Sequence, residues 1–130
     1  MSLTDTAETR VLDWVNGEGA APTRPTAPLM CRLMTANGSD SAAGTEVTGN
    51  AYTPQDANLG AASGNAVTNG SDITFSSLDS GASKVIVGIE LWDSAGTPVR
   101  IWWGALAASK TVNAGDPFVI PAGDLDLTLS

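Results

Sequence analysis

Two runs of alternating residues, 84–92 and 98–106, stand on either side of the turn sequence Asp93-Ser94-Ala95-Gly96-Thr97. Successive side chains of a β-strand point to opposite faces, so this period of two predicts two antiparallel strands joined as a hairpin. One row of each strand is expected to face the core, and these rows are Val85, Val87, Ile89 and Leu91, and Val99, Ile101 and Trp103. The hairpin is the strongest structural signal in the chain and favours a β-sheet fold.

Two tryptophans of the hairpin, Trp92 and Trp102, fall on the rows opposite to the aliphatic residues. We expect them to meet across the hairpin, because side chains that are directly opposed in an antiparallel pair lie close together. A sheet face that is open to water does not normally carry two such side chains. Either a loop or the N-terminal helix covers them, or they mark a contact with a partner.

The rest of the chain is also typical of short strands between turns, since it contains 14 glycines and 7 prolines. Further strands are expected at 29–35, 45–53, 66–68, 72–75, 110–112, 118–120 and 125–129. The dipeptide Asn69-Gly70 favours a tight turn and predicts a hairpin between the strands that flank it. The predicted fold class is all-β, a β-sandwich or jelly-roll-like domain with one short N-terminal α-helix.

The helix is predicted near the N-terminus, with Asp5 as its N-cap, Glu8 three residues later and Gly17 at its end. Its apolar residues are Val11, Leu12, Trp14 and Val15. A helix of about 12 residues is marginal on its own. It therefore either docks on the β core or forms an arm that reaches a neighbouring subunit. The chain divides into a helix or arm at 1–17, a proline-rich connector at 18–28 and a single β-sandwich domain at 29–130.

Charge and residue usage exclude several classes of function. Six Lys and Arg against 14 Asp and Glu give a net charge of −8, which would repel a nucleic-acid backbone. The chain has no histidine, and its one cysteine, Cys31, lies in an apolar run where a buried, inert thiol is expected. A nucleophilic serine would need Lys84, Lys110 or a carboxylate as its base, and neither lysine lies in a recognisable motif. No apolar run approaches the length of a membrane span. We expect no catalytic residue, cofactor or metal site, and neither nucleic acid nor membrane as a partner.

Six segments, in their order along the chain, resemble a family of small tailed-bacteriophage virion proteins. They are Val11-Leu12-Asp13-Trp14-Val15, Leu29-Met30-Cys31-Arg32-Leu33-Met34-Thr35, Gly49-Asn50-Ala51-Tyr52, Ile89-Glu90-Leu91-Trp92-Asp93, Trp103-Gly104-Ala105-Leu106 and Lys110-Thr111-Val112-Asn113-Ala114-Gly115-Asp116. Each is a strand or a turn, so the likeness over residues 11–129 rests on their order and spacing. A longer polar middle and the stretch Arg100-Ile101-Trp102-Trp103 depart from the family's pattern.

The resemblance implies a structural protein of the virion, assembled in the host cytoplasm. The first hypothesis is a capsid decoration (cement) protein that binds the major capsid protein on the outer surface of the head and stabilises it. Such a protein would self-associate as a trimer or other small ring. The alternative is a tail, baseplate or fibre-associated structural protein. A third hypothesis is a carbohydrate-binding module whose Trp92 and Trp102 stack on sugar rings.

In the structural hypotheses, binding would depend on a few large anchors and their charge partners. The candidate interface residues are Trp14, Arg24, Arg32, Tyr52, Trp92, Arg100, Trp102 and Trp103.

Overall fold

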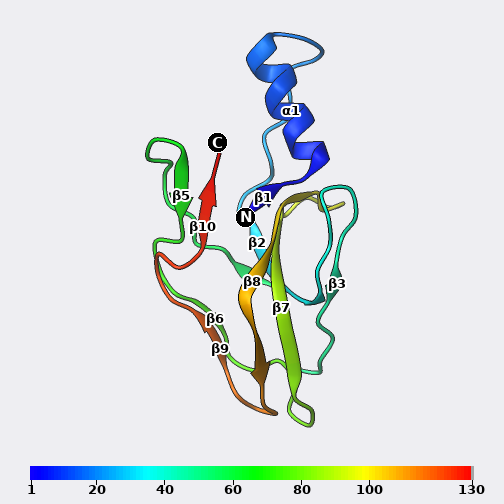
Figure 1. Cartoon of the computed structure of the whole chain (residues 1–130), viewed down its shortest axis with the longest axis vertical. Coiled ribbons are helices and arrows are strands. Elements are labelled where there is room, and N and C mark those ends of the chain that lie inside the picture. Colours follow the sequence, from blue (N-terminus) through cyan, green and yellow to red (C-terminus); the bar gives the residue numbers. More distant parts are fainter. Residues whose placement is uncertain (130) are drawn as a thin grey trace.

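An antiparallel sheet of six strands forms the larger layer of the computed structural model, which describes residues 1–129 (Figure 1). Its order is β1-β8-β7-β2-β3, and β4 pairs with the other end of β2. The strands are β1 Ser2–Leu3, β2 Met30–Ala36, β3 Thr45–Glu46, β4 Gln55–Asp56, β7 Lys84–Trp92 and β8 Arg100–Val112. The helix α1, Asp5–Asn16, follows β1 and projects from one end of the sheet. The prediction of an all-β fold with one N-terminal helix is confirmed.

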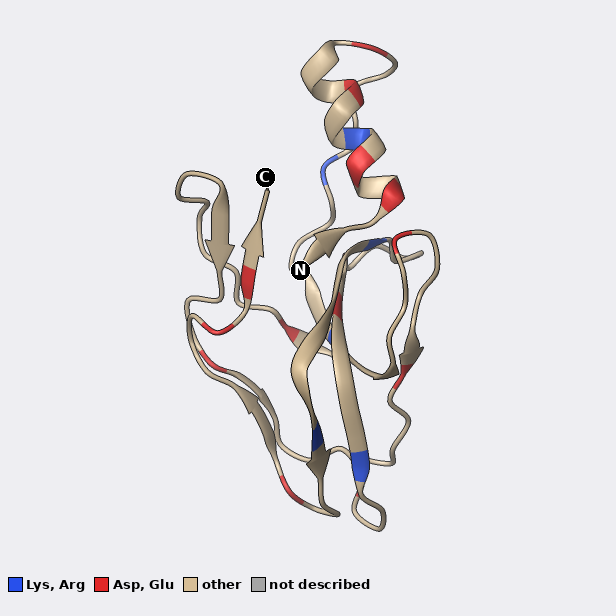
Figure 2. Cartoon of the chain, viewed as in Figure 1, with Lys and Arg blue, Asp and Glu red and all other residues tan. Residues whose placement is uncertain are grey.

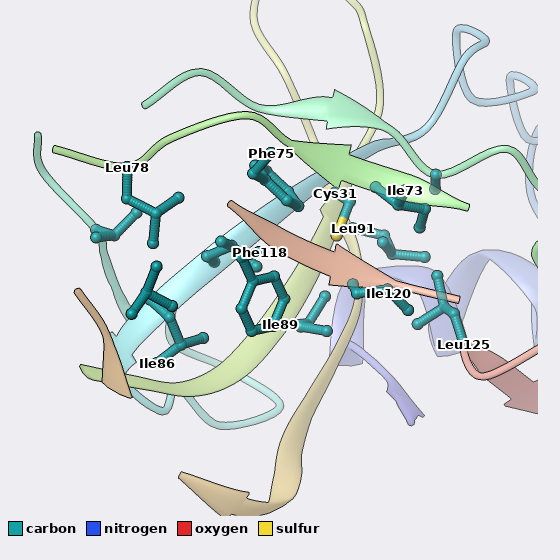
Figure 3. Packing of buried hydrophobic residues seen from close by; sticks show 14 of the residues in the cluster. Cys31, Ile73, Phe75, Leu78, Ile86, Ile89, Leu91, Phe118, Ile120 and Leu125 are labelled. Atoms are coloured by element: carbon teal, nitrogen blue, oxygen red, sulfur yellow. The ribbon is translucent and has the colours of Figure 1, made fainter. Parts of the chain in front are cut away.

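Two ribbons of two short strands complete the fold. They consist of β5 Ala66–Thr68 with β10 Asp126–Thr128, and of β6 Ile73–Phe75 with β9 Phe118–Ile120. Figure 3 shows the side chains of the β6–β9 ribbon packed against Cys31, Ile89 and Leu91 of the sheet. The rings of Phe75 and Phe118 meet edge to face with their centroids 6.1 Å apart. The main hydrophobic core therefore lies between the ribbon and one face of the sheet.

Cys31 lies at the centre of this core and is completely buried. Burial raises the pKa of the Cys31 thiol to about 12, because a thiolate in apolar surroundings would lose its hydration. The expectation that the thiol is buried is confirmed.

The hairpin of β7 and β8 is confirmed, and β8 continues to Val112, so that it includes the segment predicted as a separate strand at 110–112. The register of the pair shifts between Ile86 and Gly88. A β-bulge of this kind changes which side chains point to the core. Ile86 is therefore fully buried while Val85 is 47% exposed, so the predicted core row is wrong for Val85 and correct for Ile89 and Leu91.

The predicted contact between Trp92 and Trp102 is wrong. A second register shift places Trp92 opposite Arg100, and Trp102 lies opposite Leu91 and packs against the core. Trp92 lies on the other face of the sheet, where the guanidinium carbon of Arg32 is 4.6 Å from the ring centroid. Trp103 lies opposite Glu90 and therefore shares this outer face, although it was expected to point to the core.

The predicted hairpin around Asn69-Gly70 is also wrong. Both flanking strands form, but β5 pairs with β10 and β6 pairs with β9. Neither Asn69 nor Gly70 has the positive φ that the predicted turn requires. Asn69 is instead buried, with its Nδ2 donating to the carbonyls of Ser71 and Pro121 and its Oδ1 accepting from the N–H of Leu125. Its amide side chain replaces a turn as the link between the two ribbons.

The predicted strand at 45–53 ends early, at Glu46. The N–H of Val47 still donates to the carbonyl of Leu33, after which the segment leaves the sheet. Further along, the hydroxyl of Tyr52 accepts a hydrogen bond from the N–H of Leu33. The Tyr52 ring stacks on Phe75 with a centroid distance of 6.0 Å. This segment is therefore held by the packing of the Tyr52 ring on the core and not by pairing with a neighbouring strand. Within the described residues, no helix is long and apolar enough to cross a membrane.

Replacing Asn69 by alanine should lower the free energy of unfolding by about 1–3 kcal/mol, because buried carbonyl and N–H groups would lose their partners. The measurement is urea unfolding followed by tryptophan fluorescence. Asn113→Ala, which alters an exposed asparagine, is the matched control and should change stability by less than about 0.5 kcal/mol. Equal effects of the two substitutions would contradict the linking role of Asn69.

Candidate functional site

The structure places the predicted interface residues in three environments. Four of them meet on the outer face of the sheet, and these are Arg32, Trp92, Arg100 and Trp103. The ring of Tyr52 stacks on Phe75 in the main core, and its hydroxyl reaches Glu46 of β3. Trp102 packs against both hydrophobic clusters of the interior. Trp14 and Arg24 lie away from the sheet, on α1 and on the connector that runs beside it.

Glu90 is the centre of the polar contacts on the outer face. Its side chain is only 2% exposed, and its Oε1 accepts from Nη1 of Arg100 at 3.0 Å and from the N–H of Gly44 at 2.8 Å. The indole N–H of Trp92 donates to Oε2 at 3.0 Å. Each carboxylate oxygen therefore has a donor, which is what a buried charge requires.

Arg100 extends these contacts to the loop 37–44. Its Nη2 donates to the carbonyls of Ser39 and Asp40, at 2.7 and 3.0 Å. The indole N–H of Trp103 donates to Oδ1 of Asp40 at 2.7 Å. The ion pair of Glu90 and Arg100 thereby holds the loop against the sheet.

Glu46 joins Arg32 of the outer face to the hydroxyl of Tyr52, whose ring packs on the core. Nη1 of Arg32 and the hydroxyl of Tyr52 both donate to the Glu46 carboxylate, at 3.1 and 2.8 Å. Burial raises the pKa of Tyr52, and the Glu46 carboxylate adds to the rise, so the phenol stays protonated and remains a donor. The polar side chains on this face thus form hydrogen bonds with one another and with the loop 37–44.

Helix α1 begins at a different cap from the one predicted. Thr4, not Asp5, is the N-cap, and its Oγ1 accepts from the N–H of Ala7 at 3.3 Å. The same hydroxyl donates to the carbonyl of Arg100, and the N–H of Thr4 donates to the carbonyl of Ile101. Pairing of β1 with β8 thus fixes the start of α1. The helix ends, as predicted, at Gly17, whose φ of 70° suits glycine.

Residues 1–129 leave most of the apolar surface of α1 uncovered. Ala7 is the buried residue of the helix, whereas Val11, Leu12, Trp14 and Val15 are 38%, 59%, 69% and 65% exposed. Figure 1 shows why, since the helix touches the sheet near its first turn and then points away from it. Four exposed apolar side chains within five residues form a patch of the kind that marks an interaction site.

The connector returns alongside α1 and leaves an apolar groove of about 190 Å³ between them. Arg10 and Arg24 line the groove together with apolar residues, which include Leu3, Ala7, Val11, Trp14, Pro22 and Pro25. In the ribbon of Figure 2, the blue of Lys and Arg occurs both on α1 and on the connector beside it. The groove and the exposed side of α1 together form the candidate attachment surface.

Asp93 fixes the connector in this position. Its Oδ1 accepts from the N–H groups of Val99 and Ala95, and its Oδ2 accepts from the N–H of Thr26 at 3.2 Å. Burial of the carboxyl opposes ionisation, but these three N–H donors and the charge of Arg10 outweigh it and hold the pKa of Asp93 below its usual value. The turn of the hairpin is thereby linked to the segment that carries Arg24.

Comparison with protein families bears on the phage hypotheses. A family model described as "Podophage GP4 fiber I protein gp80" matches residues 2–128. The chain belongs to this podophage fibre family. No curated protein matches the sequence.

Membership of the fibre family confirms the resemblance to phage virion proteins and makes the chain a component of the virion. It is a phage structural protein, and the match favours the tail or fibre alternative over the decoration hypothesis. The family model includes both α1 and the β-strands, since it begins at residue 2 and ends at residue 128.

Some residues that organise this fibre-family chain were not predicted. Glu90 has a recognisable signal, because it is a carboxylate between Ile89 and Leu91 in an apolar strand whose hairpin partner carries Arg100. Asp40 has none, because its role depends on where a polar loop folds. The exposure of Leu12 and Val15 could not be read from the sequence either, since the same stripe would also suit a helix packed on the core.

Replacing Arg100 by methionine should lower the free energy of unfolding of the fibre-family chain by about 3–5 kcal/mol, because Glu90 would keep a buried charge without its cation. The double variant Glu90→Gln with Arg100→Met should recover part of this loss in a urea unfolding series. The control is Arg24→Met, which alters an exposed arginine. Full additivity of the two single losses would show that the pair is not coupled.

The pH dependence of stability should reveal Asp93. Its folded-state pKa is lowered, so its contribution is complete above the unfolded value of about 3.9 and is lost as pH falls through the folded value. Asp93→Asn should cost about 1 kcal/mol at pH 7. The difference from wild type should shrink below about pH 4 in thermal melts. A difference that stays constant down to pH 2 would contradict the assignment.

Proposed function

We propose that this chain is a non-catalytic structural subunit of a podophage tail fibre. The observation that carries the proposal is the match of the fibre family model to residues 2–128. A subunit of this kind needs a body that keeps its shape and a surface that joins it to the rest of the particle. The contacts of this chain supply a candidate for each.

The buried polar groups support a role in holding shape. Glu90, Arg100 and Asp93 are each at most 9% exposed, and all three bond backbone groups of loops or turns. Such contacts hold the loop 37–44, the hairpin turn and the connector in one arrangement. We propose the same shape-holding role for Arg32, Tyr52, Trp92 and Trp103.

The attachment surface that we propose is α1 with its groove. Trp14 is the largest exposed apolar side chain, and Arg24 is an exposed cation beside it. Buried aromatic and arginine anchors dominate the energetics of interfaces. Binding to the major capsid protein belongs to the decoration hypothesis, which the family match favours less.

The location and copy number of the protein in purified particles test the proposal. Labelling with an antibody fragment should mark the tail in electron micrographs, and quantitative mass spectrometry should give a few to a few dozen copies per particle. Hundreds of copies distributed over the head would support decoration instead. Absence from the particle, or turnover of a substrate by the purified protein, would overturn the proposal.

A further inference from the structure

Two different surfaces of α1 are left without a partner. One is the groove against the connector, to which the helix contributes Val11 and Trp14. The other is the adjoining side of the helix, where Leu12 and Val15 project and are 59% and 65% exposed. We call the second surface the knob. A helix of twelve residues is marginal in water unless its apolar face is packed against something. Residues 1–129 of a single chain do not supply that packing for Leu12 and Val15.

The charges around the two surfaces are of opposite sign. Glu8 is exposed and lies one helical turn before Leu12, so it shares the side of the helix that carries the knob. The groove is lined by two cations, Arg10 and Arg24. Within the described residues, neither of these arginines forms an ion pair within 4 Å, and the charge of Arg10 acts on Asp93 only at longer range.

These two cations are unusual in this chain. Its net charge is −8, with six Lys and Arg in all. In the part of the chain that the structure describes, three of the six are in ion pairs, namely Arg32, Lys84 and Arg100. Lys110 lies over the ring of Phe118. The remaining two, Arg10 and Arg24, both line the apolar groove. A second copy of this acidic chain would meet positive charge at the groove and would not be repelled there.

We propose that the knob of one copy, Leu12 and Val15, packs into the groove of a second copy, with Glu8 facing Arg10 and Arg24. The knob and the groove are different surfaces, so each copy offers one and accepts the other. Contacts of this heterologous kind close into a ring or continue as a filament. The inference deepens the proposed function, on which it rests, by naming the partner of the attachment surface.

The knob is tested by the oligomeric state of the full chain. Wild type at about 100 µM should run as an oligomer in size exclusion with light scattering, a concentration at which specific micromolar contacts form. Leu12→Lys with Val15→Lys should run as a single chain, because two cations would face Arg10 and Arg24. The matched control is Val85→Lys with Val119→Lys, which alters two exposed valines of the β-strands and should leave the oligomer intact.

The role of the groove is tested by exchanging the charges of Arg24 and Glu8 and measuring association. Arg24→Glu should weaken association at least tenfold, and adding Glu8→Arg should restore it. Equal association of the lysine variant and wild type, or no restoration by the second exchange, would overturn the proposal. Near-UV circular dichroism of each variant establishes that the β-sheet body is folded, so that loss of association is not loss of structure.

A different occupant gives a different result. If wild type runs as a single chain, yet particles incorporate wild type and not the lysine variant, the surface binds another virion protein and the second-copy proposal is wrong. The proposed function survives that outcome. It fails separately, if the protein is missing from the tail of the particle.

Discussion

The buried ion pair of Glu90 and Arg100 is the interaction on which the arrangement of the outer face depends. Each charge is costly to bury, and it is retained because both side chains also bond backbone groups of the loop 37–44. The loop in turn accepts the first N–H of α1, from Asp5 to the carbonyl of Asp40. One pair of charges thus connects the hairpin, the loop and the base of the helix.

The two faces of the sheet are used differently. The inner face is covered by the β6–β9 ribbon and is stabilised by removal of apolar surface from water. The outer face is covered by a loop and is stabilised by hydrogen bonds to charged groups, which are directional. The first kind of contact tolerates small changes of shape, and the second fixes the positions of particular backbone atoms. A fibre subunit that joins a symmetric particle benefits from the second kind, because its attachment surface has to be presented in the same way in every copy.

The apolar face of helix α1 is left largely exposed by the rest of the fold. Thr4 and Gly17 cap it well, and its first turn is bound to β8, but its second half carries the exposed apolar patch. Caps supply helix ends with hydrogen-bond partners and do nothing for an apolar face. The chain belongs to a virion fibre family, and a subunit of a particle is surrounded by other chains that can cover such a face.

Local pattern was sufficient for the longest elements of this protein. The alternation of residues 84–106 predicted the long hairpin, and the run from Val11 to Val15 with Gly17 predicted the helix and its end, because strand and helix periods are properties of neighbouring residues. Which strands pair, and in which register, was decided by contacts between distant parts of the chain. The bulge after Ile86 reversed the faces of β7, and the bonds of Asn69 to Pro121 and Leu125 joined segments more than fifty residues apart. Which tryptophan is covered, and which side of α1 is left open, follow from those distant contacts, because burial depends on what else the chain brings to the same place.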